Sequence, residues 1–153
     1  MTHKEQLLSR AVEYLDSQNW HYDLDAEKGV IKFGLNIDSK LKNCRMFILV
    51  EEDNIQSFAV CPMNASKDVY GNVVEFITRA NYGLKLGNFE FDYSDGEIRY
   101  QCCMACGGGV PSLVDVERCI DIGFIMLQRY GDGLVKNLMG YGNPEADIKA
   151  IEG

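Results

Sequence analysis

The sequence has no apolar run of the roughly 18 residues that a membrane-spanning helix needs. Its first residues, MTHKEQLLSR, are charged and amphipathic, so they lack the apolar centre of a signal peptide. It also lacks a stripe of clustered Lys and Arg, and its net charge of −8 disfavours binding to nucleic acid or anionic lipid. We therefore expect a cytoplasmic protein that binds neither nucleic acid nor membranes.

Recognisable catalytic motifs are missing as well. No Walker motif, G-x-S-x-G elbow or H-E-x-x-H helix occurs. The segment 107–112 is only loosely similar to a dinucleotide loop, because its third glycine is absent and the strand before it belongs to a hairpin. The acidic stretch at 23–27 does not fit a calcium loop, because Gly34 stands where a glutamate is needed. We expect neither a cofactor nor an enzymatic activity.

Helix and strand signals follow one another along all 153 residues, without a repeat, a low-complexity segment or a linker. Apolar residues make up 46% of the chain and charged residues 25%, as is typical of a soluble globular protein. A single domain spanning residues 1–153 is therefore expected.

Alternating apolar and polar residues predict a first group of strands near 20–25, 31–37, 44–51 and 55–61. The stretch CRMFILVE at 44–51 has no polar face after Arg45. Strands of this kind are typically central in their sheet, so we expect this one to be covered on both sides.

The segment NYGLKLGNFEFDYSDGEIRY at 81–100 carries the clearest local signal. Phe89, Phe91 and Tyr93 alternate with polar residues, as in a half-buried strand. Asp95-Gly96 is a tight-turn dipeptide, since both residues tolerate positive φ. Alternation resumes after the turn, so a two-strand hairpin is predicted, with Cys102 on its core face and Cys103 on the opposite face.

Helical spacing and capping signals predict helices before, between and after the strands. Thr2-x-x-Glu5 has the pattern of a capping box at the start of the first helix. The third helix should begin after Ser112 and be interrupted by Gly131 and Gly133. The predicted helices cover residues 3–18, 67–82, 113–130 and 144–151.

The resulting element order is α-β(3-4)-α-β(2)-α with a short helix at the end. Strands joined by tight turns favour an α+β fold, in which one antiparallel sheet has helices packed on one face. The expected core draws on both strand groups: Ile31, Phe33, Ile48, Phe89, Phe91 and Ile98.

This order and the 81–100 segment together resemble the YbjN-like family of small bacterial proteins. The residues that match are Asn81, Gly87, Asn88-Phe89, Asp92, Asp95-Gly96, Ile98 and Tyr100, and the tail PEADIKAIEG is similar to the end of that family. The resemblance implies a fold like that of type III secretion chaperones and a role as a regulator in sensory transduction. It supplies no catalytic residues, so we expect a non-enzymatic module for protein binding, possible roles being chaperone-like or in signal transduction.

The chain contains cysteines at positions 44, 61, 102, 103, 106 and 119. In a cytoplasmic protein most of them should be reduced and buried rather than paired in disulfides. Cys103-x-x-Cys106 is the best candidate for chemistry, because its spacing suits a redox pair or two metal ligands. Only Cys102 lies close enough to add a ligand, so no metal is expected. A thiol-based sensor or enzyme that uses Cys103 and Cys106 is the alternative function.

The third helix is apolar on more than one side, and large exposed apolar patches are rare on stable monomers. A homodimer is therefore expected, and the resemblance to secretion chaperones points the same way. Either face of the 44–51 strand or this helix would supply the contact, and Gly123 favours the helix because it lets a second backbone approach. The candidate interface residues are Ile122, Gly123, Ile125 and Met126. A different protein partner is also expected, and the sequence leaves it unidentified.

Overall fold

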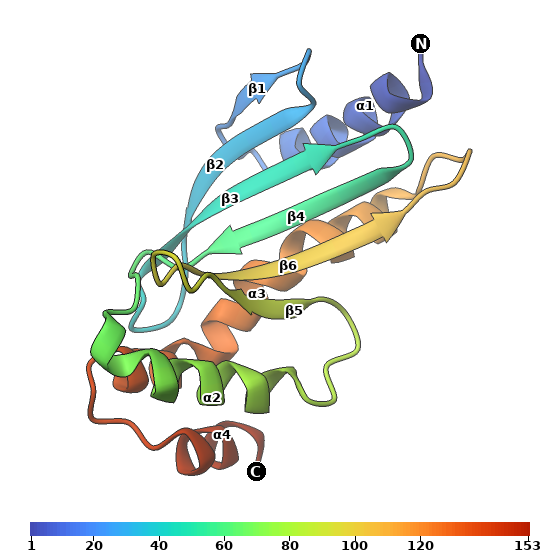
Figure 1. The fold of residues 1–153 in the computed structure, drawn as a ribbon. Coiled ribbons are helices and arrows are strands. Elements are labelled where there is room, and N and C mark those ends of the chain that lie inside the picture. Colours follow the sequence, from blue (N-terminus) through green and yellow to red (C-terminus); the bar gives the residue numbers. More distant parts are fainter.

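The computed structural model describes residues 1–153 and has a six-stranded antiparallel sheet with helices on one face and at one end (Figure 1). The predicted α+β fold is confirmed. The strands are β1 (Asp23–Asp25), β2 (Val30–Asn36), β3 (Asn43–Val50), β4 (Asn54–Val60), β5 (Asn88–Phe91) and β6 (Ile98–Ala105). The helices are α1 (His3–Ser17), α2 (Tyr70–Asn81), α3 (Leu113–Leu138) and α4 (Pro144–Glu152), with a short 3-10 helix, η1 (Lys67–Val69), before α2.

The spatial order of the strands is β1-β2-β3-β4-β6-β5, and every neighbouring pair is antiparallel. In Figure 1, α1 and α3 lie behind the sheet, while α2 and α4 pack together near the lower end of α3. The face of the sheet turned toward the viewer has no helix over it. None of the helices combines the length and the hydropathy that crossing a bilayer requires.

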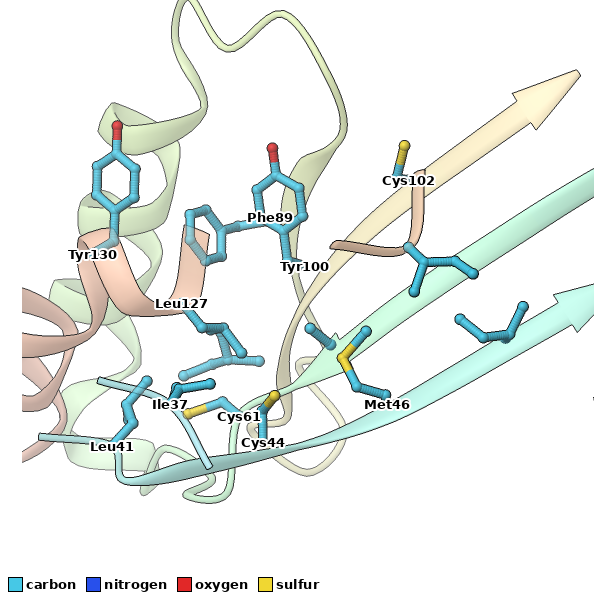
Figure 2. Packing of buried hydrophobic residues seen from close by; sticks show 14 of the residues in the cluster. Ile37, Leu41, Cys44, Met46, Cys61, Phe89, Tyr100, Cys102, Leu127 and Tyr130 are labelled. Atoms are coloured by element: carbon cyan, nitrogen blue, oxygen red, sulfur yellow. The ribbon is translucent and has the colours of Figure 1, made fainter. Parts of the chain in front are cut away.

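The core lies between the sheet and the helices. Figure 2 shows Phe89 and Tyr100 of the sheet beside Leu127 and Tyr130 of α3. The Phe89 ring meets Tyr100 and Tyr130 edge-on, with centroid distances of 4.9 and 5.6 Å. All the predicted core residues are buried except Phe91, which is half-buried.

The hairpin of β5 and β6 forms, but its turn is wider than predicted. β5 ends at Phe91, and the Asp92 amide donates to the Glu97 carbonyl at 2.9 Å. The Asp92 carboxylate accepts hydrogen bonds from the amide and the hydroxyl of Ser94, which bend the chain away from strand geometry. Tyr93 consequently lies on the surface instead of continuing the strand face.

The first predicted strand is shorter than expected, because β1 contains only Asp23–Asp25. Trp20 turns toward the core, where its ring stacks on Phe33 with a centroid distance of 5.4 Å. Packing of this ring against the sheet therefore replaces strand pairing at the start of the segment.

Helix α3 continues through Gly131 and Gly133, so the predicted interruption was wrong. A Cβ at Gly131 would lie 2.5 Å from Ser39 Oγ, and one at Gly133 would lie 2.9 Å from Phe76 Cε2. The glycines let the loop after β2 and helix α2 approach the axis of α3 closely. This packing outweighs the loss of helix propensity, which is about 1 kcal/mol for each glycine.

Strand β3 is interior, as predicted, but only one of its faces is covered. The face toward α1 and α3 is buried, whereas Arg45, Phe47 and Leu49 point to the side without helices. Arg45 is exposed, and Phe47 and Leu49 are half-buried. The expectation of cover on both sides was therefore wrong. Apolar side chains on both faces of a strand do not require a layer of helices over each face.

Candidate functional site

The thiols of β6 point in alternate directions, as the strand period requires. Cys102 is buried beneath the helices, Cys103 is exposed on the opposite face, and Cys106 just after the strand is half-buried. None of the six cysteines forms a disulfide. The predicted orientation of Cys102 and Cys103 is confirmed.

The surroundings of Cys103 and Cys106 do not favour a reactive thiolate. Burial raises the pKa of the Cys103 thiol, and Cys102, Glu51 and Asp53 raise it further. Burial also raises the pKa of Cys106, with smaller contributions from Cys103 and Asp53. Reactive cysteines need electropositive surroundings that lower the pKa, and here the neighbouring side chains are acidic.

A second pair of thiols lies inside the protein. Cys119 of α3 points its sulfur toward two backbone carbonyls, Ile55 O at 3.6 Å and Cys102 O at 3.9 Å. The interaction of its thiol with the Cys102 side chain, followed by burial, raises the pKa of Cys119. The proton therefore stays on Cys119, which behaves as a packing residue. No group of three or more His, Cys, Asp or Glu side chains has the geometry of a metal site.

The glycine run after β6 forms a loop that two side chains of α1 hold in place. His3 Nε2 lies 2.7 Å from Gly109 O, and Arg10 donates a hydrogen bond to Pro111 O. The other ring nitrogen of His3, Nδ1, lies 2.6 Å from Glu52 O in the turn between β3 and β4. One histidine thus joins three segments that are far apart in the sequence, and no sequence motif indicated it.

The hydrogen bonds of His3 favour its charged form. Both partners, Gly109 O and Glu52 O, are carbonyl oxygens that only accept hydrogen bonds, whereas a neutral imidazole has a single N–H. Hydrogen bonding to Gly109, and then to Glu52, raises the pKa of His3 above its ordinary 6.5. The contact is therefore complete only when the ring is protonated.

A groove of about 500 Å³ runs between the end of β6, the loop 107–111 and the first turns of α3. This edge groove contains both candidate thiols, Cys103 and Cys106. Asp115 and Arg118 are its charged side chains. Its other walls are mainly apolar: Leu86, Met104, Val110 and Pro111.

A second groove of about 590 Å³ adjoins the first and follows α3, and we refer to it as the helix groove. Leu86 and Arg118 line both grooves, and Ile122 and Ile125 add apolar surface to the helix groove. Asp121, also in this groove, accepts a hydrogen bond of 2.7 Å from the hydroxyl of Tyr14. Burial raises the pKa of Asp121 to about 6, which the Tyr14 hydrogen bond partly opposes.

The candidate interface on α3 is only partly on the surface. Ile125 is 44% exposed, and Ile122 and Met126 are half-buried. Gly123 is buried, and a Cβ there would lie 2.7 Å from Ala59 Cβ. Its predicted role was therefore wrong, because Gly123 brings α3 close to the sheet of the same chain instead of to a second backbone.

The side of the sheet without helices, which we term the open face, carries large apolar side chains. Phe47 and Phe58 stand directly opposite each other in β3 and β4, and both are half-buried. Lys32 lies 5.8 Å from the centroid of the Phe47 ring, and the Arg99 guanidinium lies 4.2 Å from that of Phe58. Lys32 and Arg99 thus cover the two rings, and the attraction between each cation and the ring face holds both side chains in this position.

Comparison with known proteins identifies the fold. No family model matches the chain, and no curated protein matches its sequence. Among solved structures, YbjN, described as "a putative transcription regulator from E. coli", matches 81% of this chain and 92% of its own, with a TM-score of 0.53 and 8% identity. The protein has a YbjN-like fold.

The YbjN-like fold confirms the resemblance indicated by the 81–100 segment, and at 8% identity the likeness concerns the fold alone. Asn81, one of the matching residues, has a clear structural role. Its side-chain amide donates to Phe89 O at 3.0 Å and its oxygen accepts from Phe89 N at 2.7 Å, which fixes β5 against the end of α2.

Proposed function

We propose that the protein is a non-enzymatic, protein-binding regulatory module that acts as a homodimer. The observation that carries this proposal is the open face, an apolar surface that none of the four helices covers. Contiguous apolar patches of this kind mark interaction sites on soluble proteins. The likeness to YbjN, itself described as a regulator, supports the regulatory part of the proposal.

The apolar part of the open face is a continuous strip across three strands. Val30 is paired with Leu49, and Phe47 with Phe58, so their side chains stand next to one another on the same face. Val60 extends the strip toward β6. A shallow depression of about 340 Å³ lies among these side chains and would receive apolar groups from another protein.

The charges around the strip favour a second copy of the same chain as the occupant. Arg45 and Glu97 line the depression, and neither forms an ion pair within the protein. A twofold axis brings the same patch of both copies together, so it must be self-complementary. With both signs of charge on one face, Arg45 of each copy would meet Glu97 of the other.

Light scattering of wild type and two variants tests this proposal at tens of micromolar protein. Phe47→Glu places a charge in the open face and should give a monomer with unchanged circular dichroism. Ile125→Asp is the matched control on α3, and it should remain a dimer. A monomeric wild type would refute the dimer. If Ile125→Asp is monomeric and Phe47→Glu remains dimeric, the interface lies at the candidate residues on α3 instead of on the open face.

We further propose a role in sensory transduction, a chaperone-like contact with another protein, and a cytoplasmic location. Six free thiols suit the reducing conditions of the cytoplasm. Nucleic acid and membranes are not proposed as partners, because a net charge of −8 opposes the approach of phosphate groups.

The alternative function, a thiol-based sensor or enzyme, stays a prediction. Cys103 and Cys106 both line the edge groove and are accessible to a small reagent. Their raised pKa values weigh against it, since the thiolate is the reactive form.

A further inference from the structure

Strand β6 is longer than the strand beside it. β4 pairs with residues 99–105 of β6 on one side, whereas β5 pairs only with residues 98–101 on the other. The last part of β6, residues 102–105, therefore has a neighbour on one side only (Figure 1). Such a free edge is able to pair with an additional strand.

The backbone groups of this free edge can be assigned from the hydrogen bonds at both ends of β6. The Cys61 amide donates to Ile98 O at 2.9 Å, and the Cys106 amide donates to Asp53 O at 2.7 Å, both on the β4 side. Because the bonding direction alternates along a strand, the N–H and C=O groups of Cys103 and Ala105 point away from β4. No turn or loop hydrogen bond reaches them.

The chain itself does not fill the edge, because β5 begins only at Asn88, directly after Gly87. Gly87 has φ of 72°, and a side chain there would collide with Gln101 O. The residue before it, Leu86, does not continue the strand but lines the edge groove, and its carbonyl accepts a hydrogen bond from the Tyr100 hydroxyl. The space next to residues 102–105 is left to a different segment.

The edge groove lies where side chains of an added strand would point. Cys102 and Met104 face the helices, and the groove separates them from Asp115 and Arg118 on α3. Successive side chains of a strand point to opposite faces, so alternate residues of an added strand would enter this mainly apolar groove. The helix groove extends the apolar surface to Ile125.

The charged lining of the two grooves favours a basic segment. Asp115 lines the edge groove, Glu117 and Asp121 line the helix groove, and Arg118 is the only cation in either. Three carboxylates against one guanidinium produce a negative potential, which attracts a positively charged segment as a whole, including Lys or Arg side chains that do not enter the grooves.

We propose that residues 102–105 of β6 bind an extended, basic and alternately apolar peptide segment of a partner protein, which adds a strand to the sheet. The segment is about four residues long, matching the free edge, and places its apolar side chains in the edge groove. This inference rests on the proposed protein-binding function and gives it a site separate from the open face.

The test uses a fluorescein-labelled peptide, Thr-Val-Lys-Leu-Thr-Val-Lys, titrated with the full-length protein and followed by anisotropy. Saturable binding is expected, together with slower hydrogen exchange of the Cys103 and Ala105 amides. The same peptide with N-methylated amides should not bind, because it is unable to form the ladder. Equal binding of both peptides would overturn strand addition.

Two protein variants locate the site. Ala105→Pro removes a donor that has no partner in the folded protein, and it should weaken binding at least about tenfold. Glu117→Lys reduces the negative charge of the helix groove. It should weaken binding more than Glu27→Lys, which makes the same charge change at an exposed position outside both grooves.

The outcomes separate this inference from the proposed function. If the wild type is dimeric but fails to bind the peptide up to about 1 mM, the edge site is wrong and the protein-binding module stands. Unchanged affinity in both Ala105→Pro and Glu117→Lys would also overturn the site. If neither a dimer nor peptide binding is found, the proposed function fails together with the inference.

Discussion

Two phenylalanines of β5 allow a direct test of how the hairpin packs. Phe89 and Phe91 share the face that points toward the helices, yet Phe89 is 3% exposed whereas Phe91 is only half-buried. Phe89 contacts Tyr100 and Tyr130 edge-on, and Phe91 contacts the more exposed Tyr70 and Tyr93. Replacing each by alanine therefore compares a closed site with a partly open one.

The expected losses follow from burial and from how far each site is able to collapse. A buried Phe→Ala change costs about 3–5 kcal/mol, which includes the cavity left behind. Phe89→Ala belongs at the upper end, about 4–5 kcal/mol, because the two hydrogen bonds to Asn81 hold the backbone at this position in place. Phe91→Ala should cost about 1–2 kcal/mol, since water already reaches the ring.

Urea unfolding followed by circular dichroism measures both losses. The midpoint should fall much further for Phe89→Ala than for Phe91→Ala, with unchanged slopes in both. A loss of about 4 kcal/mol is a large share of the roughly 5–15 kcal/mol that stabilises a typical domain. Equal losses, or a loss below about 1 kcal/mol for Phe89→Ala, would show that Phe89 does not pack between Tyr100 and Tyr130 in the core.

The remaining predictions concern a histidine, the thiols and the contact between α3 and the sheet. Because its pKa is raised, His3 contributes fully to stability below pH 6.5 and loses this contribution as the pH rises through the pKa of the folded protein. The melting temperature of His3→Ala should accordingly lie below that of wild type at about pH 5.5, and the difference should shrink by about pH 9. A difference that does not change with pH would contradict the raised pKa of His3. A thiol reagent should label the exposed Cys103 before the buried Cys102, as mass spectrometry of digests would show, and simultaneous labelling would mean that β6 opens. Gly123→Leu should lower the unfolding free energy by about 2–3 kcal/mol, because a Cβ alone would crowd Ala59, and an unchanged denaturation midpoint would place Gly123 away from the sheet.

Local sequence signals predicted the elements whose causes lie within a few residues. The Thr2 and Glu5 capping box makes both of its hydrogen bonds at the start of α1. Asn143 caps α4 through the Ala146 amide, close to where the predicted last helix begins. Alternation along β6 placed Cys102 inside and Cys103 outside, because a strand has a fixed period of two.

Signals of the same local kind were misleading where distant segments meet. Gly131 and Gly133 suggested a helix break, since glycine lowers helix propensity by about 1 kcal/mol. Their contacts with Ser39 and Phe76, far away in the sequence, reverse that expectation. Gly123 was likewise assigned to a second chain, although its neighbour is Ala59 of the same sheet.

By itself, the sequence determined the α+β class, the order of the elements and the direction in which most side chains point, because these depend on periodicity and capping. Only the tertiary structure decided which face of β3 is open, where β6 lacks a neighbour and what His3 joins. Those features depend on pairings across the chain, such as His3 with Gly109, which are 106 positions apart. Many alternative pairings satisfy the same local pattern, and only simultaneous packing of all elements selects one of them.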